Sequence, residues 1–199
     1  MVLQSLTDLH LADLIRGKTF TASPAAWEDQ VLYFLMVDRF SDGQEGLLVE
    51  AGSVTALSAA LAAALLEKLV HGPRTTSRLR RVRRECVALI RRDAEMFARV
   101  VRATRTKNRR AFERSLKAAT EVPCRVFERA QAVQAACRAA QREVKPQFQS
   151  DLRCAMALAL AAAESARTLI QTNLAWLNDQ AYARAIRRRL QTASQRHGR

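Results

Sequence analysis

Apolar residues recur every three or four positions over most of the chain beyond residue 50, which is the spacing of one face of an α-helix. The pattern therefore predicts a series of long helices there, over residues 54–70, 75–106, 108–137, 150–177 and 178–193. Few glycines and prolines interrupt these stretches, and their Ala, Leu, Arg and Gln content favours helix. We expect an all-α protein, built as an antiparallel bundle of about five main helices.

The helix within 146–177 is expected to be the central, buried helix of this bundle. Ser150 is a candidate side-chain cap for its start. Nearly every residue over 155–166 is small or apolar, which suits a helix surrounded by others at close approach. Asp151 and Asn173 fall near one face, but they lie about 33 Å apart along the axis at 1.5 Å per residue. A single small reacting group cannot touch both.

The first 50 residues follow a different pattern. Residues 1–18 contain short amphipathic turns that predict an opening helix of the bundle, and residues 51–199 form the predicted helical domain. Between them, 19–50 is expected to be an irregular insert or a single strand, because its one β-prone run has no obvious partner. Its segment 27–43, WEDQVLYFLMVDRFSDG, resembles the opening strand of α-amylase (β/α)₈ barrels. Such a barrel needs about 250 residues and eight strands, so we expect no glycosidase activity.

Charge narrows the range of partners. The chain has a formal net charge of +14, and it is unevenly distributed: residues 1–50 carry 3 basic and 8 acidic side chains, and the remaining 149 carry 30 and 11. A basic body of this kind can attract nucleic acid or another polyanion. However, the arginines are spread over many helical turns and lack aromatic stacking partners. We therefore expect solvated helix faces rather than a nucleic-acid site.

Cysteine and histidine usage argues against a metal centre or a disulfide framework. The three histidines are isolated, and no CxxC pair occurs among the cysteines. We expect buried thiols in a reducing compartment at Cys86, Cys124, Cys137 and Cys154. Acidic residues interrupt the N-terminal apolar segment, so no secretory signal is expected. The apolar run 54–66 is too short to span a bilayer. The prediction is a cytoplasmic protein without a membrane partner.

Asp93 is the residue whose position in the pattern suggests chemistry. It lies near the apolar stripe of the helix over 75–106, which we expect to place Phe97 on the core side. A carboxyl held away from water there would have its ionised form disfavoured and could transfer protons. The competing interpretation is that an arginine of the same helix pairs with it. The pattern alone leaves both open.

Three stretches read together carry a resemblance to a known family. They are GSVTALSAALAAALLE over 52–67, RDAEMF over 92–97 followed by ATEVP over 119–123, and SDL over 150–152 followed by Asn173. In order and spacing they resemble the cyclodeaminase domain found in formiminotransferase-cyclodeaminase and in bacterial methenyltetrahydrofolate cyclohydrolases. The opening LTDLHLADLI also resembles the usual start of that domain.

This resemblance implies an all-helical bundle, commonly a homodimer, that acts on tetrahydrofolate one-carbon derivatives. The family closes 5-formimino-tetrahydrofolate with loss of ammonia, or opens 5,10-methenyl-tetrahydrofolate with water. Both reactions need one positioned acid and polar groups that orient the folate, so no metal is expected. The resemblance implies proton transfer by Asp93, with Asp151 as the second candidate. It implies substrate binding by Gly52, Ser53, Ser150 and Asn173.

Three departures from the family pattern keep alternatives open. Val49, Glu50 and Ala51 stand where the family has Pro-Gly-Gly, and HGPRTTSRL over 71–79 replaces a longer connection. Leu169 occupies the place of the first Asn in the family's NVxIN motif. One alternative is therefore a helical interaction protein of the same fold that has lost the chemistry. A weaker one is a basic protein that binds nucleic acid non-specifically.

Overall fold

Helices make up nearly all of the computed structural model, which describes residues 51–106 and 108–197. No β-strand occurs in these two ranges. The elements are α2 (Ala51–Leu69), α3 (Pro73–Arg105), α4 (Arg109–Ala140), the short 3₁₀ helix η4 (Pro146–Phe148), α5 (Gln149–Trp176) and α6 (Gln180–His197). The predicted all-α class with five main helices is confirmed. The opening helix and the insert predicted before residue 51 lie outside the described residues and stay predictions.

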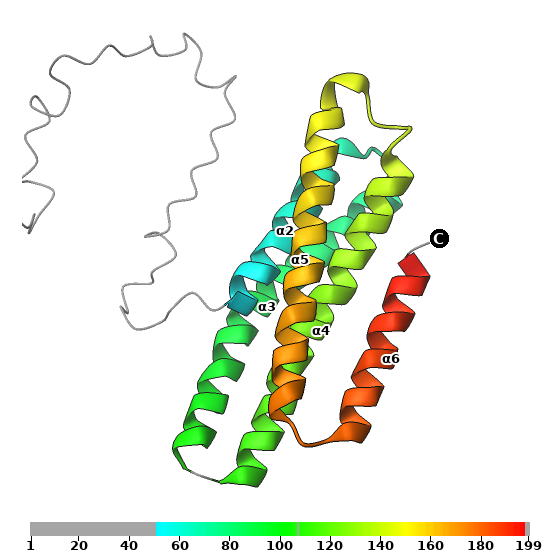
Figure 1. Ribbon diagram of the computed structural model, residues 1–199. Helices are drawn as coiled ribbons and strands as arrows, with labels where there is room; N and C mark the ends of the chain where they lie inside the picture. Colours follow the sequence, from blue (N-terminus) through cyan, green and yellow to red (C-terminus); the bar gives the residue numbers. More distant parts are fainter. Residues whose placement is uncertain (1–50, 107, 198–199) are drawn as a thin grey trace, which may run out of the picture. The chain divides into compact units, whose positions relative to one another are not determined.

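The helices α2 to α5 form an antiparallel bundle, and α6 runs beside it (Figure 1). Here α2 packs against α3, α4 and α5, while α4 also packs against α3 and α5. The last helix, α6, packs mainly on α4. All of these helices belong to one compact unit.

Alanine side chains make up much of the buried surface of α2 and α5, which pack against each other. They recur along the buried sides of the two helices, and each is at most 4% exposed: Ala56, Ala59, Ala60 and Ala63 on α2, and Ala155, Ala159, Ala162 and Ala166 on α5. Small side chains let two helix backbones approach closely. The largest buried side chains, Phe127, Leu66 and Met96, fill the wider spaces of the core.

The helix α5 is buried on one side only. Its main neighbours are α2 and α4, and Leu160 on its outer side is 48% exposed. Cys154 is also exposed, whereas the other three cysteines are buried. The predictions of a helix surrounded on all sides and of a buried Cys154 were therefore wrong. An alanine-rich composition shows that a helix can pack closely, but not how many neighbours it has.

The predicted cap at Ser150 is also wrong, and Ser53 does not cap α2. The helix α2 begins two residues before Ser53, whose hydroxyl is used elsewhere. The helix α5 begins one residue before Ser150 and has no side-chain cap. The start of α6 is as predicted, because Asp179 Oδ1 accepts a hydrogen bond of 2.9 Å from the Tyr182 backbone N–H. Pro123 neither ends nor restarts a helix, since α4 continues through it.

Charged contacts between side chains hold α6 against α4. The Arg189 guanidinium donates to Glu128 Oε1 at 2.6 Å and to Glu121 Oε2 at 2.7 Å, and these carboxylates raise the pKa of Arg189. At the start of the helix, Lys117 Nζ lies 2.6 Å from Asp179 Oδ2. Bonds of this charge-assisted, forked kind fix orientation as well as distance. They set the position of α6 relative to the bundle.

The helix α2 is long and apolar enough to span a membrane, whereas the run 54–66 was judged too short from the sequence. Half of the apolar window of α2 is buried inside the bundle.

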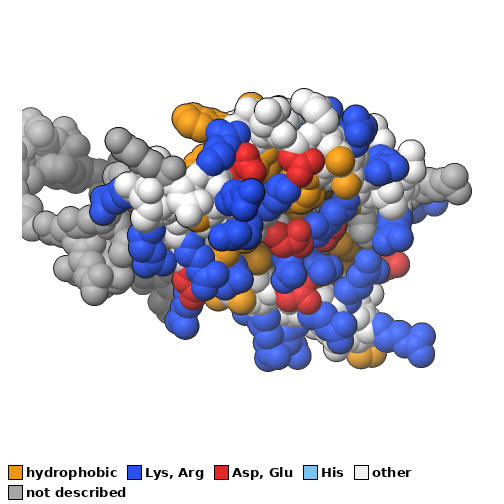
Figure 2. Space-filling view, turned by 90° about the horizontal axis from the view of Figure 1, so that it is seen from below, with side chains coloured by type: hydrophobic (Ala, Val, Ile, Leu, Met, Phe, Trp, Pro, Cys, Tyr) orange, Lys and Arg blue, Asp and Glu red, His pale blue; other side chains and the backbone are white. Residues whose placement is uncertain are grey.

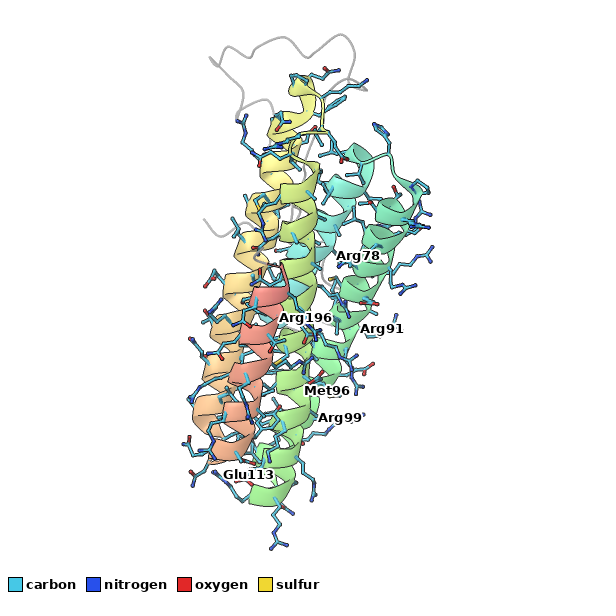
Figure 3. All side chains as sticks on the ribbon, turned by 90° about the vertical axis from the view of Figure 1, so that its right-hand side faces the viewer. Arg78, Arg91, Met96, Arg99, Glu113 and Arg196 are labelled. Atoms are coloured by element: carbon cyan, nitrogen blue, oxygen red, sulfur yellow. The ribbon has the colours of Figure 1, made fainter. Side chains whose placement is uncertain are left out.

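Arginine dominates much of the exposed surface of the bundle. Arg78, Arg91 and Arg99 follow one another along α3 (Figure 3). In the view from below, Lys and Arg side chains cover much of the face, with Asp and Glu scattered among them (Figure 2).

Candidate functional site

A pocket of about 420 Å³ lies at the first turn of α2, between this turn and the helices α3, α4 and α5. Its wall is mostly apolar and includes the aromatic side chains of Phe97, Phe112 and Trp176, so we name it the aromatic pocket. Asp93 and Asn173 add one carboxyl and one amide. Four helices supply the lining residues that lie in the described part of the chain: Ala51, Gly52, Asp93, Phe97, Val100, Val101, Thr104, Phe112, Leu116, Ala119, Pro123, Leu169, Thr172, Asn173 and Trp176.

The carboxyl of Asp93 rests against the first turn of α2. The Ser53 hydroxyl lies 3.2 Å from Asp93 Oδ2 and 3.3 Å from the Ile90 carbonyl oxygen, and the Ser53 backbone N–H also donates to Asp93. Gly52 permits this approach, because a Cβ at that position would overlap the carboxyl group. Asp93, on α3, therefore caps the start of α2 from a different helix.

The electrostatic environment of Asp93 favours its protonated form. Burial raises its pKa above the ordinary value of 3.8, while the hydrogen bonds from Ser53 act in the opposite direction. The nearest arginine in sequence, Arg92, binds Glu95 at 3.1 Å instead. No cation pairs with Asp93 within the described residues, so the pairing with an arginine that the sequence left open is absent there. A half-buried acid without a counter-ion faces the aromatic pocket.

Across the pocket, α5 contributes one amide. Asn173 is half-buried and lines the pocket, and in the part of the chain that the structure describes its amide makes no hydrogen bond. Leu169, one turn earlier, lines the same wall. The place where the family pattern has its first Asn is therefore apolar here. Asn173 is left as the polar side chain of α5 that can orient a ligand.

Pro123 adds a further acceptor to the pocket. Proline has no backbone N–H, so it cannot donate to the carbonyl of the residue four positions earlier in a helix. That residue is Ala119, and both Ala119 and Pro123 line the pocket. The carbonyl of Ala119 thus lacks its usual helical donor beside the cavity. It can accept a hydrogen bond from a ligand N–H.

The rim of the aromatic pocket is marked by two exposed rings. Phe97 is 46% exposed and Trp176 is 66% exposed. The prediction that Phe97 faces the core was wrong, because Met96 takes the buried position with 1% exposure. Trp176 could have been found from the sequence, since it follows Asn173 by three residues and so shares its helix face. Phe112 also lines the pocket, but no feature of the sequence pointed to it as a site residue.

Not all of the predicted site residues meet. Gly52, Asp93 and Asn173 line the aromatic pocket, and Ser53 reaches it through Asp93. Asp151 is half-buried in the first turn of α5, next to an exposed Ser150. From there to Asn173 the helix rises about 33 Å. One chain therefore does not bring Ser150 and Asp151 to the pocket.

The described cysteines and histidines offer no second centre. Among residues 51–106 and 108–197, no three His, Cys, Asp or Glu side chains lie together as a metal site would require. Burial raises the pKa of Cys86 and of Cys124 to about 12. Thiols of this kind remain protonated and are poor nucleophiles.

We predict unequal effects on stability from two Gly→Ala substitutions. Gly52→Ala places a methyl group in the space of the Asp93 carboxyl, and we expect it to lower the free energy of unfolding by about 1–3 kcal/mol. Gly72→Ala is the matched control, because its Cβ lies 3.6 Å from the nearest heavy atom and φ is −75°. It should change stability by less than about 1 kcal/mol.

Urea unfolding of both variants tests the contact. In an Asp93→Ala background the clash is removed, so the cost of Gly52→Ala should largely disappear. An equal cost in both backgrounds would show that Gly52 and Asp93 are not coupled.

Comparison with known proteins places the chain in a family. The family model described as formiminotransferase-cyclodeaminase matches residues 71–192. Among solved structures, the crystal structure of formiminotetrahydrofolate cyclodeaminase from Thermotoga maritima has the same fold, with a TM-score of 0.72 and 19% sequence identity over 80% of this chain and 88% of that one. No curated protein matches the chain. Since the family model covers more than half of the sequence, the chain belongs to the formiminotransferase-cyclodeaminase family.

Proposed function

We propose that this protein acts on a tetrahydrofolate one-carbon derivative. It either closes 5-formimino-tetrahydrofolate with release of ammonia or hydrolyses 5,10-methenyl-tetrahydrofolate. The observation that carries the proposal is the Asp93 carboxyl at the wall of the aromatic pocket, whose pKa is raised by burial and which has no counter-ion among residues 51–106 and 108–197. Membership of the family supports the same class of substrate.

The lining of the pocket suits a fused, nitrogen-rich ring. Its volume of about 420 Å³ is within the usual range for small-ligand sites. Phe97 and Trp176 at the rim offer flat apolar surfaces for stacking. Asn173 and the carbonyl of Ala119 offer hydrogen-bond partners for ring N–H groups. Apolar faces and a polar edge are the two features of a pterin.

Asp93 can supply the proton transfers of either reaction. In ring closure, N10 attacks the carbon of the protonated formimino group and loses its proton to the Asp93 carboxylate. The carboxyl then gives that proton to the departing nitrogen as the C–N bond breaks, so that ammonia leaves and the methenyl ring remains. In hydrolysis, the carboxylate takes a proton from the attacking water and returns it to the ring nitrogen that is released. A pKa above that of an ordinary aspartate suits both directions of transfer near neutral pH.

The other predicted residues have supporting or untested roles. Gly52 leaves space for the carboxyl, and Ser53 fixes its orientation. Asn173 would position the folate. Participation of Ser150 and Asp151 stays a prediction, because it needs a second copy of the chain to bring them to the pocket.

We predict that the full-length protein speeds the loss of methenyl-tetrahydrofolate absorbance or the release of ammonia from formimino-tetrahydrofolate. Asp93→Asn keeps the shape of the side chain but cannot transfer protons, so the rate should fall by about 100-fold or more. Glu95→Gln is the matched control, two residues away in an exposed ion pair with Arg92. It should keep the rate within about twofold of the unmodified chain.

Two outcomes would contradict the enzymatic proposal. Rates equal to buffer with both substrates, while folate still binds, would indicate a bundle that has lost its chemistry. Steeply salt-dependent binding to random DNA without folate binding would favour the basic nucleic-acid binder.

We also propose that two copies associate through the outer face of α2 and the adjoining side of α5. Val54 and Leu61 on α2 are 47% and 41% exposed, and Leu160 on α5 is 48% exposed. The first charged residue of α2 is Glu67, near its end. Because the rest of the bundle over residues 51–199 is strongly basic, two copies repel each other least where the uncharged outer face of α2 meets its equivalent.

Sedimentation of the full-length protein tests this assembly. We expect a dimer at micromolar concentration and a monomer for Leu61→Arg, which places a charge in the apolar face. Ala185→Arg adds the same charge on the exposed side of α6 and should leave the dimer intact. A monomeric unmodified chain, or equal dissociation by both substitutions, would contradict the proposal.

A further inference from the structure

The helix α3 carries far more basic than acidic side chains. It contains eleven arginines and three acidic residues. Two of these acids are held in ion pairs, because Arg129 lies 2.6 Å from Glu85 and Arg92 lies 3.1 Å from Glu95. The third, Asp93, lines the aromatic pocket. The acids of α3 therefore leave most of its arginines without a partner on the same helix.

Most of these arginines have no ion pair among the described residues. Arg80, Arg83 and Arg92 bind glutamates. Figure 3 shows Arg78, Arg91 and Arg99 along one edge of α3. Counted at 100° per residue, seven of the remaining eight arginines fall within about 140° of the helix circumference. All seven are exposed, and we name them the arginine face: Arg74, Arg78, Arg81, Arg84, Arg91, Arg99 and Arg102.

The start of the arginine face is hollowed. A cavity of about 450 Å³ is lined by Pro73, Arg74, Ser77, Arg78 and Arg81. Three guanidinium groups and one hydroxyl thus surround it, with no acid among the described lining residues. These groups donate hydrogen bonds to phosphate oxygens, and arginine can donate two at once. The hollow is therefore suited to a phosphate group.

The spacing of the arginines has an electrostatic cost. Arg74, Arg78 and Arg81 are three or four residues apart, so their side chains are neighbours on the helix surface. Like charges at this spacing destabilise a helix. The hollow that the three side chains line contains no described acid that would reduce the repulsion. A bound polyanion would offset it.

The shape of the face selects among polyanions. From Arg74 to Arg102 it extends about 42 Å along one helix, at 1.5 Å per residue, which suits a linear polyanion. The aromatic residue of α3, Phe97, falls outside the arc of the face and lines the aromatic pocket, so the face offers no ring for stacking on the bases of a single strand. Val87 lies beside the arc and is 51% exposed, which is too little apolar surface for insertion into a bilayer.

A duplex of B-form DNA meets these requirements. Its major groove is about 12 Å wide and admits an α-helix, whose diameter is about 10–12 Å. Arginines spread over about 140° of the circumference of α3 would then reach phosphates on both sides of the groove. The major groove of an RNA duplex is deep and narrow, so it does not receive a helix in this way.

We propose that the arginine face of α3 binds the phosphate backbone of double-stranded DNA without selecting a base sequence. The sequence alone favoured solvated arginines, because they are spread over many helical turns. The structure brings those of α3 to one side of a single helix. None of the seven arginines lines the aromatic pocket, so this activity goes beyond the folate-dependent function and does not depend on it.

Fluorescence anisotropy of a labelled DNA duplex, titrated with the full-length protein at several salt concentrations, tests the proposal. Because the groove curves away from a straight helix, we expect about four phosphate contacts and a slope of log Kobs against log salt concentration of about −4. The triple variant Arg78→Gln, Arg91→Gln, Arg99→Gln should bind about tenfold or more weakly. Its slope should become shallower by about 1 for each arginine that contacts a phosphate.

A second triple variant is the matched control. Arg153→Gln, Arg184→Gln and Arg188→Gln remove the same charge from exposed positions of α5 and α6. This variant should keep the slope, and its affinity should stay within about threefold of the unmodified chain. An equal loss in both triple variants would reduce the effect to overall charge and overturn the proposal.

Further probes separate this surface from other partners and from the proposed function. Tighter binding to duplex RNA, to a single DNA strand or to vesicles of anionic lipid would overturn the proposal, as would no binding to the DNA duplex. Turnover of the folate substrates should be equal in the first triple variant and the unmodified chain. If no folate substrate is turned over but duplex DNA binds with the expected dependence on the arginine face, the surface is supported and the proposed function fails.

Discussion

The contact between the Asp93 carboxyl and the first turn of α2 is the constraint on which the rest of the site depends. It joins a helix start to a side chain 40 residues later in the sequence. The contact exists because residue 52 has no side chain and residue 53 offers both a hydroxyl and a backbone N–H. A shift of α2 by one helical turn, about 5.4 Å, would remove all three conditions. The chemistry of the acid is therefore tied to the packing of the bundle.

Alanine sets the packing distance that this contact requires. Where α2 and α5 face each other, the buried side chains are mostly methyl groups, so the two backbones lie close and leave no room for a ligand. Around the first turn of α2, large side chains such as Phe97, Phe112 and Trp176 line the pocket instead. Asp93, the acid of the pocket, lies against that first turn.

The sequence predicted the helices well because 3.6-residue periodicity and the breaks at Gly72–Pro73 and Asn178–Asp179 are local signals. It also predicted that Gly52, Ser53, Asp93 and Asn173 belong together, although that grouping came from the family resemblance. Periodicity could not decide between Met96 and Phe97, which differ by one position at the edge of a stripe. Nor could it show that α5 has an exposed side, because the number of neighbours of a helix is a property of the assembled bundle.

The same limit applies to the aromatic pocket. It draws on four helices, so no single stretch of sequence contains its pattern. Asp151 illustrates the converse: it shares a helix face with Asn173, yet the length of α5 separates the two. Residues that share a face lie on one line, but they do not necessarily share a site.

The most direct test of this account is a ¹³C NMR titration of the Asp93 side-chain carboxyl, assigned by its loss in Asp93→Asn. Burial without a counter-ion predicts a pKa above 3.8. The folded protein would then bind this proton more tightly than the unfolded chain. The stability that this proton adds would be complete below pH 3.8 and lost as the pH rises through the folded-state pKa. A midpoint at or below 3.8 would contradict the account, because it would show that the hydrogen bonds from α2 keep the group ionised.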